Sequence, residues 1–488
     1  MKHVTPKSVS IFCVLSVTLA MTVAPLVATS APAQAETGGV DQTPVMGWSS
    51  WSFLRMGLSA ARIKGEAKAL VTTGLAADGY KYVNIDDNWY QCPGPQGPNV
   101  DQYGRWIINS KEFPDAGSEN GIEAVAKYVH SLGLKFGIYE TAGISKQAVA
   151  KNTPILGAKY TADEIATKAP QNNYNCAGME RINDKAPGAQ AYVDSIVDEL
   201  ASWGVDYIKL DGITNQNVPD IEAWSRAIKQ SGRSMVLDTT EGSFTVKIAP
   251  SLKLYSNQWE FAPDIEINGP DEGLPKSCYT ATFKGCLSVF PLTSYSHWED
   301  RFNDVAKWQS FSGPGGFNDY DSIGVGDGTT KSGMSFHAEE SELSLWSLGS
   351  APLVLGVDLT SAVTNAYGSR SSLDPTDLKL LTNKQVIEVD QDSIPAKRIF
   401  DVDHTQMFAK VEPSADGIVG LFDTKTDLSA ANETITTRAS AIGLRGDSSG
   451  YKVQNLWTGQ VSAISAAGKI SVSVPSEGVA LLRVTPLG

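Results

Sequence analysis

The chain has 488 residues, a length that favours two or three domains because single hydrophobic cores rarely grow past about 250–300 residues. Hydrophobic residues make up 42% of the sequence and charged residues 19%, a balance typical of soluble globular proteins. The formal net charge of −14 argues against nucleic acid and anionic membranes as partners, because like charges repel, and it suits an uncharged ligand.

The first residues have the features of a secretory signal peptide, which we predict to span residues 1–35. Lys2 and Lys7 supply a basic start, residues 10–29 are apolar, and Ala33-Gln34-Ala35 forms a cleavage signal. An uncleaved membrane anchor is the alternative. No other apolar run approaches the roughly 20 residues that a membrane-spanning helix needs. The sequence therefore predicts an extracellular protein that does not contact the membrane once the signal is removed.

The cysteines agree with an oxidising compartment. Cys13 lies in the leader, and four remain: Cys92, Cys176, Cys278 and Cys286. An even number favours two disulfides, with three possible connectivities. The short spacing between Cys278 and Cys286 favours a bond between them, which leaves Cys92 with Cys176. Free buried cysteines are the alternative, and no CxxC or HxxxH spacing indicates zinc.

Short apolar runs alternate with amphipathic segments over residues 40–390. The runs are residues 45–51, 80–89, 134–142, 205–212, 234–240, 252–260, 316–323 and 352–359. Apolar residues recur with helical spacing in segments 120–133, 189–204 and 217–231. Eight strand–helix units predict an α/β fold, a (β/α)₈ TIM barrel, whose functional groups lie at the carboxyl ends of its strands. A doubly wound open sheet is the alternative.

Two long segments, 143–188 and 266–300, interrupt this alternation and carry cysteines. We interpret them as walls of a pocket, with surface decoration as the alternative. Residues 392–488 differ from the barrel, because short alternating strands separated by turns predict an antiparallel β-sandwich domain. These strands are expected in QMFAKVEP, GIVGLFDT, YKVQNLWTG, KISVSVP and GVALLRVTP.

Acidic and aromatic residues gather at the ends of the predicted barrel strands. They are Asp86, Asp87, Trp89, Tyr139, Glu140, Lys209, Asp211, Asp238, Glu241, Trp259, Glu260, Asp264, Asp319, Asp321 and Asp358. Buried carboxylates are costly unless they are paired or hydrogen-bonded. A ring of them beside aromatic rings is what a sugar pocket needs, because carboxylates accept hydrogen bonds from hydroxyls and aromatic faces cover the apolar side of a pyranose. Composition does not select the two carboxylates that glycoside cleavage requires.

Six motifs occur in an order that resembles a known family. They are Gly47-Trp48-Ser49-Ser50-Trp51, Asp86-Asp87-Asn88-Trp89, Phe136-Gly137-Ile138-Tyr139, Asp206-Tyr207-Ile208-Lys209-Leu210-Asp211, Gly313-Pro314-Gly315-Gly316-Phe317-Asn318-Asp319 and Ala351-Pro352-Leu353-Val354-Leu355-Gly356. Together they resemble glycoside hydrolase family 27 of clan D, which contains α-galactosidases and α-N-acetylgalactosaminidases. Leu456-Trp457-Thr458-Gly459 resembles part of the family's C-terminal β-domain, so the resemblance covers about residues 40–485.

The resemblance implies roles for individual residues. The Asp of the family's K-x-D strand is the nucleophile, which carries to Asp211. The acid/base Asp of the family's W-R-x-x-x-D-I pattern carries to Asp264. Sugar contacts carry to Trp48, Asp86, Asp87, Lys209 and Asp321. Tyr139, Glu241 and Glu260, at or after the ends of the third, fifth and sixth runs, complete the predicted substrate-binding set.

The chain departs from the family pattern at two informative positions. Glu260 stands where the family has an arginine, so a group that only donates hydrogen bonds is replaced by one that accepts them when ionised. Ile213 stands where the family has a cysteine after the nucleophile. Cys176 therefore loses its usual partner, which supports Cys92 as the replacement.

The leading hypothesis is a secreted retaining glycoside hydrolase, an α-galactosidase that cleaves terminal α-D-galactosides of an oligo- or polysaccharide. A same-family hydrolase with another glycone, such as an isomalto-dextranase or β-L-arabinopyranosidase, is one alternative. An inactive sugar-binding protein is another. No metal or organic cofactor is implied, and the sequence assigns no oligomeric state.

Overall fold

The computed structural model describes Met1 and residues 39–51, 53–240, 244–266, 293–325, 334–360 and 375–488. The predicted signal peptide, Glu241, Cys278 and Cys286 therefore lie outside the described residues. From Gly39 onward the described chain belongs to one compact unit. In the part of the chain that the structure describes, no helix is both long and apolar enough to cross a membrane.

Eight short parallel strands form the central sheet, and each falls within one of the predicted runs. They are β1 (Met46–Ser49), β2 (Tyr82–Ile85), β3 (Lys135–Thr141), β7 (Tyr207–Asp211), β8 (Val236–Thr240), β9 (Gln258–Glu260), β10 (Phe317–Asp319) and β11 (Leu353–Leu355). Nearly all their residues are buried, as expected for parallel strands that are covered on both faces.

The strand order identifies the sheet as a TIM-like barrel. Strands that follow one another in the chain are neighbours from β1 to β10, and β1 also pairs in parallel with β11. A parallel bridge between Ile323, just after β10, and Leu355 of β11 joins the last two strands, with Ile323 N donating to Val354 O over 2.7 Å. A doubly wound open sheet would not bring its first and last strands together, so that alternative is excluded.

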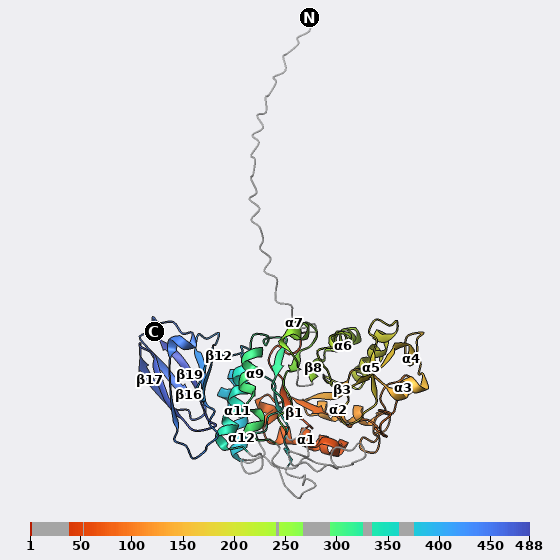
Figure 1. Cartoon of the computed structure of the whole chain (residues 1–488), viewed down its shortest axis with the longest axis horizontal. Coiled ribbons are helices and arrows are strands. Elements are labelled where there is room, and N and C mark those ends of the chain that lie inside the picture. Colours follow the sequence, from red (N-terminus) through yellow and green to blue (C-terminus); the bar gives the residue numbers. More distant parts are fainter. Residues whose placement is uncertain (2–38, 52, 241–243, 267–292, 326–333, 361–374) are drawn as a thin grey trace. The chain divides into compact units, whose positions relative to one another are not determined.

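Helices between the strands cover the outside of the barrel (Figure 1). The main ones are α1 (Ala60–Thr72), α2 (Gly121–Ser131), α5 (Ala189–Ser202), α6 (Val218–Ser231), α7 (Ala249–Tyr255), α8 (Tyr295–Trp298), α9 (Arg301–Trp308) and α11 (Phe336–Gly349), with single turns η1 (Arg55–Gly57), η2 (Leu75–Asp78) and η3 (Val246–Ile248). Local sequence sets several boundaries. The Asn120 side chain accepts hydrogen bonds from the first amides of α2, and Gly232 ends α6 in the left-handed conformation at φ 72°.

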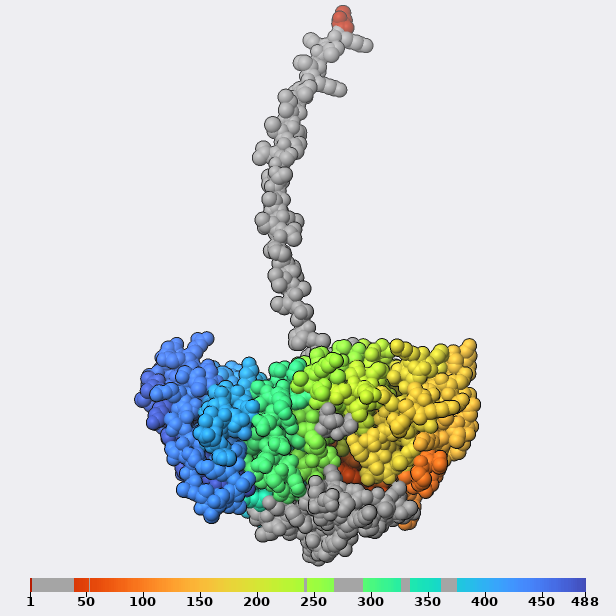
Figure 2. Space-filling view, in the orientation of Figure 1, coloured from red at the N-terminus to blue at the C-terminus, as the bar shows by residue number. Residues whose placement is uncertain are grey.

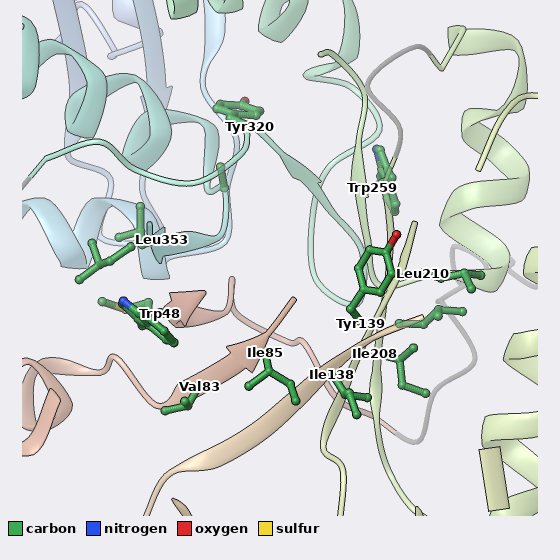
Figure 3. Close-up of a cluster of buried hydrophobic side chains, with 14 of the residues drawn as sticks. Trp48, Val83, Ile85, Ile138, Tyr139, Ile208, Leu210, Trp259, Tyr320 and Leu353 are labelled. Atoms are coloured by element: carbon green, nitrogen blue, oxygen red, sulfur yellow. The ribbon is translucent and has the colours of Figure 1, made fainter. Parts of the chain in front are cut away.

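Apolar side chains of adjacent barrel strands pack into one buried cluster (Figure 3). Ile138 on β3 and Ile208 and Leu210 on β7 belong to it and are fully buried. Side chains alternate along a strand, so Tyr139, Lys209 and Asp211 take the opposite face, toward the barrel interior. This alternation separates the residues that stabilise the barrel from those available for chemistry.

The predicted wall segment 143–188 is a small subdomain rather than an irregular loop. It contains β4 (Ile144–Ser145), α3 (Lys146–Lys151), α4 (Ala162–Ile165), β5 (Ala166–Gln171) and β6 (Met179–Ile182), and its three strands pair in the order β4-β6-β5. The predicted bond between Cys92 and Cys176 is present, with the Cα atoms 5.9 Å apart. It ties this subdomain to the chain that follows β2.

The C-terminal strands are antiparallel, as predicted, and pair in the orders β12-β13-β14-β19-β16-β17 and β15-β18. They are β12 (Lys397–Val402), β13 (Thr405–Val411), β14 (Gly417–Asp423), β15 (Glu433–Arg438), β16 (Gly450–Asn455), β17 (Val461–Ser465), β18 (Lys469–Val474) and β19 (Val479–Leu487), with the short helix α14 (Ala439–Ile442). The two sheets enclose their own hydrophobic cluster. Helices α12 (Pro375–Leu381) and α13 (Lys384–Gln391) precede them.

One face of the C-terminal sheet packs on helices of the barrel. Helix α11 contacts β13, β14 and β19, and the Phe302 ring of α9 lies 5.0 Å from the ring of Phe422, centroid to centroid. The blue and green surfaces of these segments adjoin in the space-filling view (Figure 2). The predicted division at residues 390–392 falls at the end of α13, before β12, and separate folding of the two parts stays a prediction.

Candidate active site

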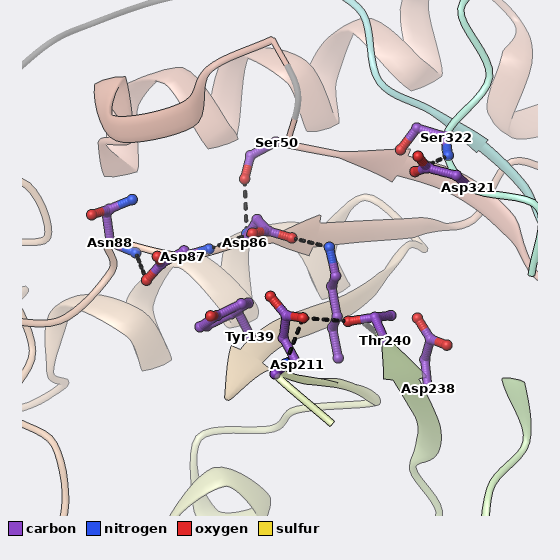
Figure 4. Close-up of polar contacts among 12 residues, drawn as sticks. Ser50, Asp86, Asp87, Asn88, Tyr139, Asp211, Asp238, Thr240, Asp321 and Ser322 are labelled. Carbon is purple, nitrogen blue, oxygen red and sulfur yellow. Dashed lines mark hydrogen bonds and ion pairs between the residues drawn. The ribbon is translucent and has the colours of Figure 1, made fainter. Parts of the chain in front are cut away.

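Three charged side chains meet at the carboxyl ends of β2 and β7 (Figure 4). The Lys209 ammonium donates to Oδ2 of Asp86 over 2.8 Å, and Asp211 lies two residues further along the same strand face. The backbone N–H of Asp86 donates to the Ser50 hydroxyl over 2.8 Å, which fixes the turn after β2 against the end of β1. The Lys209–Asp86 ion pair therefore links β7 to the end of β2 across the intervening strand β3.

The Asp211 carboxylate is oriented through one of its two oxygens. Oδ1 accepts hydrogen bonds from the Gly212 backbone N–H over 2.6 Å and from the Thr240 hydroxyl over 3.0 Å. Among the described residues, none donates a hydrogen bond to the other oxygen, Oδ2. Burial raises the pKa of Asp211 to about 7, although the Lys209 ammonium lowers it. A carboxylate held by one oxygen with the other available has the geometry that a nucleophile needs.

Lys209 is the cation around which the acidic groups are arranged. Burial lowers its pKa, but the neighbouring carboxylates of Asp86, Asp211 and Glu260 outweigh burial and hold it well above the usual value. The side chain is 25% exposed, so the ammonium is partly accessible to a ligand. A charged lysine here favours the ionised carboxylate of Asp211 and can still donate to a sugar hydroxyl.

The Asp87 carboxylate is buried and surrounded by donors. Oδ1 accepts from the Tyr90 hydroxyl over 2.5 Å and from the Asn88 backbone N–H over 2.7 Å, and Oδ2 accepts from the Asn175 amide over 2.8 Å. Burial raises the pKa of Asp87 to about 6 against the lowering effect of these hydrogen bonds. Asp87 is 1% exposed, so it contacts a ligand only if a protein donor gives way.

The Tyr139 side chain points into the barrel beside Asp211 (Figure 4). Its hydroxyl donates to Oδ1 of Asn173 over 3.3 Å, and the Tyr90 hydroxyl oxygen, whose proton goes to Asp87, lies 3.2 Å from the same Asn173 oxygen. Burial and the Asp87 and Asp211 carboxylates raise the pKa of Tyr139 well above its usual value, so the hydroxyl keeps its proton and remains a donor.

A second group of carboxylates lies after β9 and β10. Glu260, Asp264 and Asp321 each have an oxygen within 4.8 Å of those of the other two. Glu260 is buried, Asp321 is half-buried and Asp264 is exposed. Burial together with the Asp264 carboxylate raises the pKa of Asp321 to about 7. The exposed Asp264 is the member of this group that is most accessible to a ligand.

Glu260, which replaces the family's arginine, faces this carboxylate group. It is 4% exposed, and its Oε1 atom has no hydrogen-bond partner among the described residues. No ion pair within 4.0 Å involves Glu260 in the described structure, although Lys209 lies close enough to lower its pKa. Burial, followed by the Asp321 and Asp264 carboxylates, holds the pKa of Glu260 well above its usual value. A protonated Glu260 beside Asp321 is the physically favoured state, because adjacent buried carboxylates share a proton.

Backbone geometry fixes Asp321 in this group. Its φ of 81° lies in the left-handed region, which a short polar side chain tolerates when local hydrogen bonds support it. Oδ2 accepts from the Ile265 backbone N–H over 2.7 Å, and Oδ1 accepts from the Ser322 backbone N–H over 2.5 Å. Asp321 therefore connects the segment after β10 to Ile265, which directly follows Asp264.

Not every predicted contact residue is exposed to the site. Trp48 has 0% exposed surface, packs in the main core, and donates from Nε1 to Val357 O over 2.7 Å (Figure 3). A sugar contact by Trp48 needs movement of its neighbours and stays a prediction. Trp51, three residues later, is half-buried, with the Arg55 guanidinium 4.8 Å from its ring centre. It is the more accessible tryptophan of the same motif.

The three grouped carboxylates are also the described residues that come closest to a metal-binding set. Oxygens within 4.8 Å of one another could coordinate a hard cation such as Ca²⁺. The raised pKa values of Glu260 and Asp321 oppose this, because a metal ligand must lose its proton. The expectation that no metal is needed stays a prediction.

Sequence reasoning missed the residues that orient the predicted site. Asn173 and Asn175 reach Tyr139 and Asp87 from segment 143–188, and Thr240 from β8 holds Asp211. Their signal in the sequence was the asparagine-rich stretch before Cys176, which the disulfide fixes beside the end of β2. These contacts support the interpretation of the segment as a wall of the site.

Comparisons with known proteins agree with this architecture. A family model described as alpha galactosidase A matches residues 43–169, and one described as an alpha galactosidase C-terminal beta sandwich domain matches residues 402–484. A probable alpha-galactosidase of Dictyostelium discoideum is 30% identical over 456 residues, which cover 92% of this chain and 94% of that protein. An alpha-galactosidase of Oryza sativa subsp. japonica is 28% identical over 453 residues, covering 92% of this chain and 86% of its own.

Solved structures show the same fold. A family 27 β-L-arabinopyranosidase of Geobacillus stearothermophilus superposes with a TM-score of 0.76 at 24% identity, covering 91% of this chain and 97% of its own. Alpha-galactosidase I of Mortierella vinacea superposes with a TM-score of 0.67 at 25% identity, covering 92% and 98%. The barrel, the carboxylates at its strand ends and these relatives define a glycoside hydrolase. The chain belongs to glycoside hydrolase family 27, the α-galactosidase family.

Proposed function

We propose that this protein is a secreted, retaining exo-glycosidase that removes terminal α-D-galactosyl units from an oligo- or polysaccharide. The observation that carries the proposal is the Asp211 carboxylate, which is held through Oδ1 beside the Lys209–Asp86 ion pair. A second carboxylate, Asp264, is exposed after β9 and lies near enough to raise the pKa of Asp211. Two carboxylates with separate environments are the minimum that glycoside hydrolysis requires.

In the proposed mechanism Oδ2 of Asp211 attacks the anomeric carbon, while the Asp264 carboxylic acid gives its proton to the departing glycosidic oxygen. The covalent glycosyl–Asp211 ester then reacts with a water molecule, from which Asp264 takes the proton. Asp211 leaves as a carboxylate, so each group returns to its starting state. Lys209 favours the ionised form of Asp211 before the attack.

The remaining polar groups support binding of the sugar. Lys209 offers a donor and Asp86 an acceptor at the carboxyl ends of β7 and β2, and Tyr139 and Asp87 take part if the sugar displaces their protein partners. The proposed sugar contact of Glu241, which lies outside the described residues, rests on the sequence alone. A retaining mechanism also requires the reacting carboxyl groups of Asp211 and Asp264 to lie about 5–5.5 Å apart. That separation is part of the proposal.

Glu260 favours a second candidate, a family member with another glycone. Its buried, unpaired oxygen is not a substitute for an arginine that donates to a sugar hydroxyl. Binding sites built for one hydroxyl pattern reject others, because buried polar groups are left unpaired. The β-L-arabinopyranosidase of Geobacillus stearothermophilus shares the fold and shows that the family's barrel accommodates another glycone.

Two experiments distinguish the two candidate functions: a comparison of substrates with the wild type, and a comparison of two Glu260 variants. Aryl α-D-galactoside, aryl β-L-arabinopyranoside and dextran are offered to the wild type, and kcat/KM is compared. If the site is galactose-specific, the aryl α-galactoside is the best substrate. If Glu260 selects another glycone, Glu260→Arg raises aryl α-galactosidase activity, whereas the isosteric Glu260→Gln does not. Loss of all activity in both folded variants would contradict a purely selective role.

The proposal of secretion rests on the leader-like residues 1–35 and on the bond between Cys92 and Cys176. N-terminal sequencing of protein from the culture medium of an expressing cell tests it. The expected first residue is Glu36, directly after the Ala33-Gln34-Ala35 signal. Retention of residues 1–35 on a membrane-bound product would contradict it.

A further inference from the structure

A hollow of about 320 Å³ lies between helices α11 and α12 and the turn after β16. Phe336 and Glu340 of α11, Thr376 and Lys379 of α12, Asn383 and Trp457 are among its lining residues. None of the lining residues belongs to the candidate active site at the barrel strand ends. The volume is that of a small-molecule pocket, about the lower limit of the usual range.

The aromatic wall of the hollow is fixed in place. Trp457 Nε1 donates to the Ser344 hydroxyl of α11 over 2.9 Å, and its backbone N–H donates to Asn455 Oδ1 over 2.9 Å. The Asn383 amide donates to Leu456 O over 3.0 Å and so ties the start of α13 to the residue before the tryptophan. A half-buried tryptophan that is already fixed by these hydrogen bonds loses little conformational entropy when a ligand packs against it.

The polar groups around the hollow are of both signs. The Glu340 side chain is 16% exposed, and the Nδ1 atom of His337 lies 3.8 Å from its carboxyl group. Lys379 and Thr376 are exposed on α12. A carboxylate accepts hydrogen bonds, an ammonium donates them, and a hydroxyl does both. Burial raises the pKa of Glu340 to about 7 against the lowering effect of Lys379, so its carboxyl group donates when protonated and accepts when ionised. The set suits an uncharged ligand with many hydroxyl groups.

We propose that this hollow is a second saccharide site, which binds one pyranose unit of a neutral polysaccharide between Trp457 and the Glu340–Lys379 pair. A pyranose has an apolar face for an aromatic ring and hydroxyls at its edge for donors and acceptors. The site accounts for Trp457, whose motif the active site leaves unused. It holds a polymer to the enzyme while the barrel acts on another part of the same chain. The proposal rests on the proposed function only for the chemical class of the ligand.

The test is affinity electrophoresis in native gels that contain galactomannan or dextran. The Asp211→Ala protein serves as the background, because it leaves the polymer uncleaved. The hollow between α11 and α12 is unchanged in the Asp211→Ala protein, so we expect at least one of the two polymers to slow the migration of this protein. Lys379→Ala removes a donor, and Thr376→Trp fills the mouth of the hollow from an exposed position. Each is expected to weaken binding roughly tenfold, about the effect of one lost hydrogen bond to a charged group.

Lys384→Ala is the matched control, because Lys384 is an exposed lysine on the next helix that does not line the hollow. Its retardation by the polymer, measured relative to its own mobility in a gel without polymer, should equal that of the background protein. Aryl-glycoside hydrolysis by the same three variants in the active enzyme should stay at the wild-type rate. Equal retardation of all variants, or no retardation by either polymer, overturns the second site. Failure of the proposed function appears separately, as lack of aryl-glycoside hydrolysis by the wild type.

Discussion

The substitution Glu260→Gln tests how the carboxylates beside the proposed acid/base retain their proton. The change removes one ionisable carboxyl group from the group of Glu260, Asp264 and Asp321 and keeps the side-chain shape. Burial and carboxylate neighbours hold the pKa of Glu260 well above normal and that of Asp321 at about 7. Because the three sites interact, their protons belong to the group rather than to one residue.

The expected magnitude follows from the spacing of the oxygens. Two unit charges 4.8 Å apart repel by about 3.5 kcal/mol at an effective dielectric constant of about 20. That energy corresponds to about 2.5 pKa units, of which only part is expressed because Glu260 is only partly ionised when the group loses its last proton. Removing Glu260 therefore makes that last proton easier to lose, and the alkaline limb of the pH profile is expected to move to lower pH by about 1–2 units.

The assay is the pH dependence of kcat and kcat/KM on the best aryl glycoside of the wild type. Glu388→Gln is the control, because Glu388 is an exposed carboxylate on α13 whose side chain is 63% accessible. Its alkaline limb should coincide with that of the wild type. If Glu260→Gln folds and its alkaline limb also stays in place, the carboxylate group does not hold the catalytic proton and the reasoning is refuted.

Three further predictions follow from single features. Asp211→Ala should lower kcat by several powers of ten while the circular dichroism spectrum is unchanged, and wild-type-like turnover would remove Asp211 from the mechanism. Glu342 is fully buried, accepts from the Gly324 N–H, and has its pKa raised to about 8, so its stabilising effect is complete below about pH 4.5 and is lost as the pH rises toward 8. In denaturant unfolding the wild type should lose up to about 5 kcal/mol of unfolding free energy between those two pH values, and Glu342→Gln should not. Equal dependence of the unfolding free energy on pH in both proteins would contradict the burial argument. Replacing Cys92 and Cys176 by serine opens a loop with a sequence separation of 84 and should cost about 3–4 kcal/mol, seen as a lower thermal midpoint, whereas an unchanged midpoint would show that the bond does not constrain the unfolded chain.

The barrel was predictable because its strands are nearly continuous apolar runs with turn residues between them. Runs such as 134–142 and 205–212 contain the observed strands β3 and β7, and the helical spacing in 189–204 matches α5. Closure of the sheet was a weaker inference. It depends on the pairing of β1 with β11, two strands that lie far apart in the sequence, and on the bridge between Ile323 and β11.

Only the site residues that lie at strand ends or in recognisable motifs could be predicted from the sequence. Asp86, Lys209 and Asp211 meet because the parallel strands β2 and β7, which lie on either side of β3, end at the same edge of the barrel. The direction of Glu260 could not be read from its sequence position, since it depends on the register of β9 against β8 and β10. Asn173 and Asn175 could not be assigned either, because their contacts depend on how a long segment folds back onto the barrel.

The configuration of the first product tests the central claim most directly. Hydrolysis of an aryl α-D-galactoside, or of the best aryl glycoside found, is followed by proton NMR from the first minutes, before the free sugar equilibrates between anomers. A covalent intermediate on Asp211 with Asp264 as acid and then base gives two inversions, so the account predicts that the first sugar has the anomeric configuration of the substrate. Initial release of the opposite anomer would contradict the assignment of Asp211 as nucleophile.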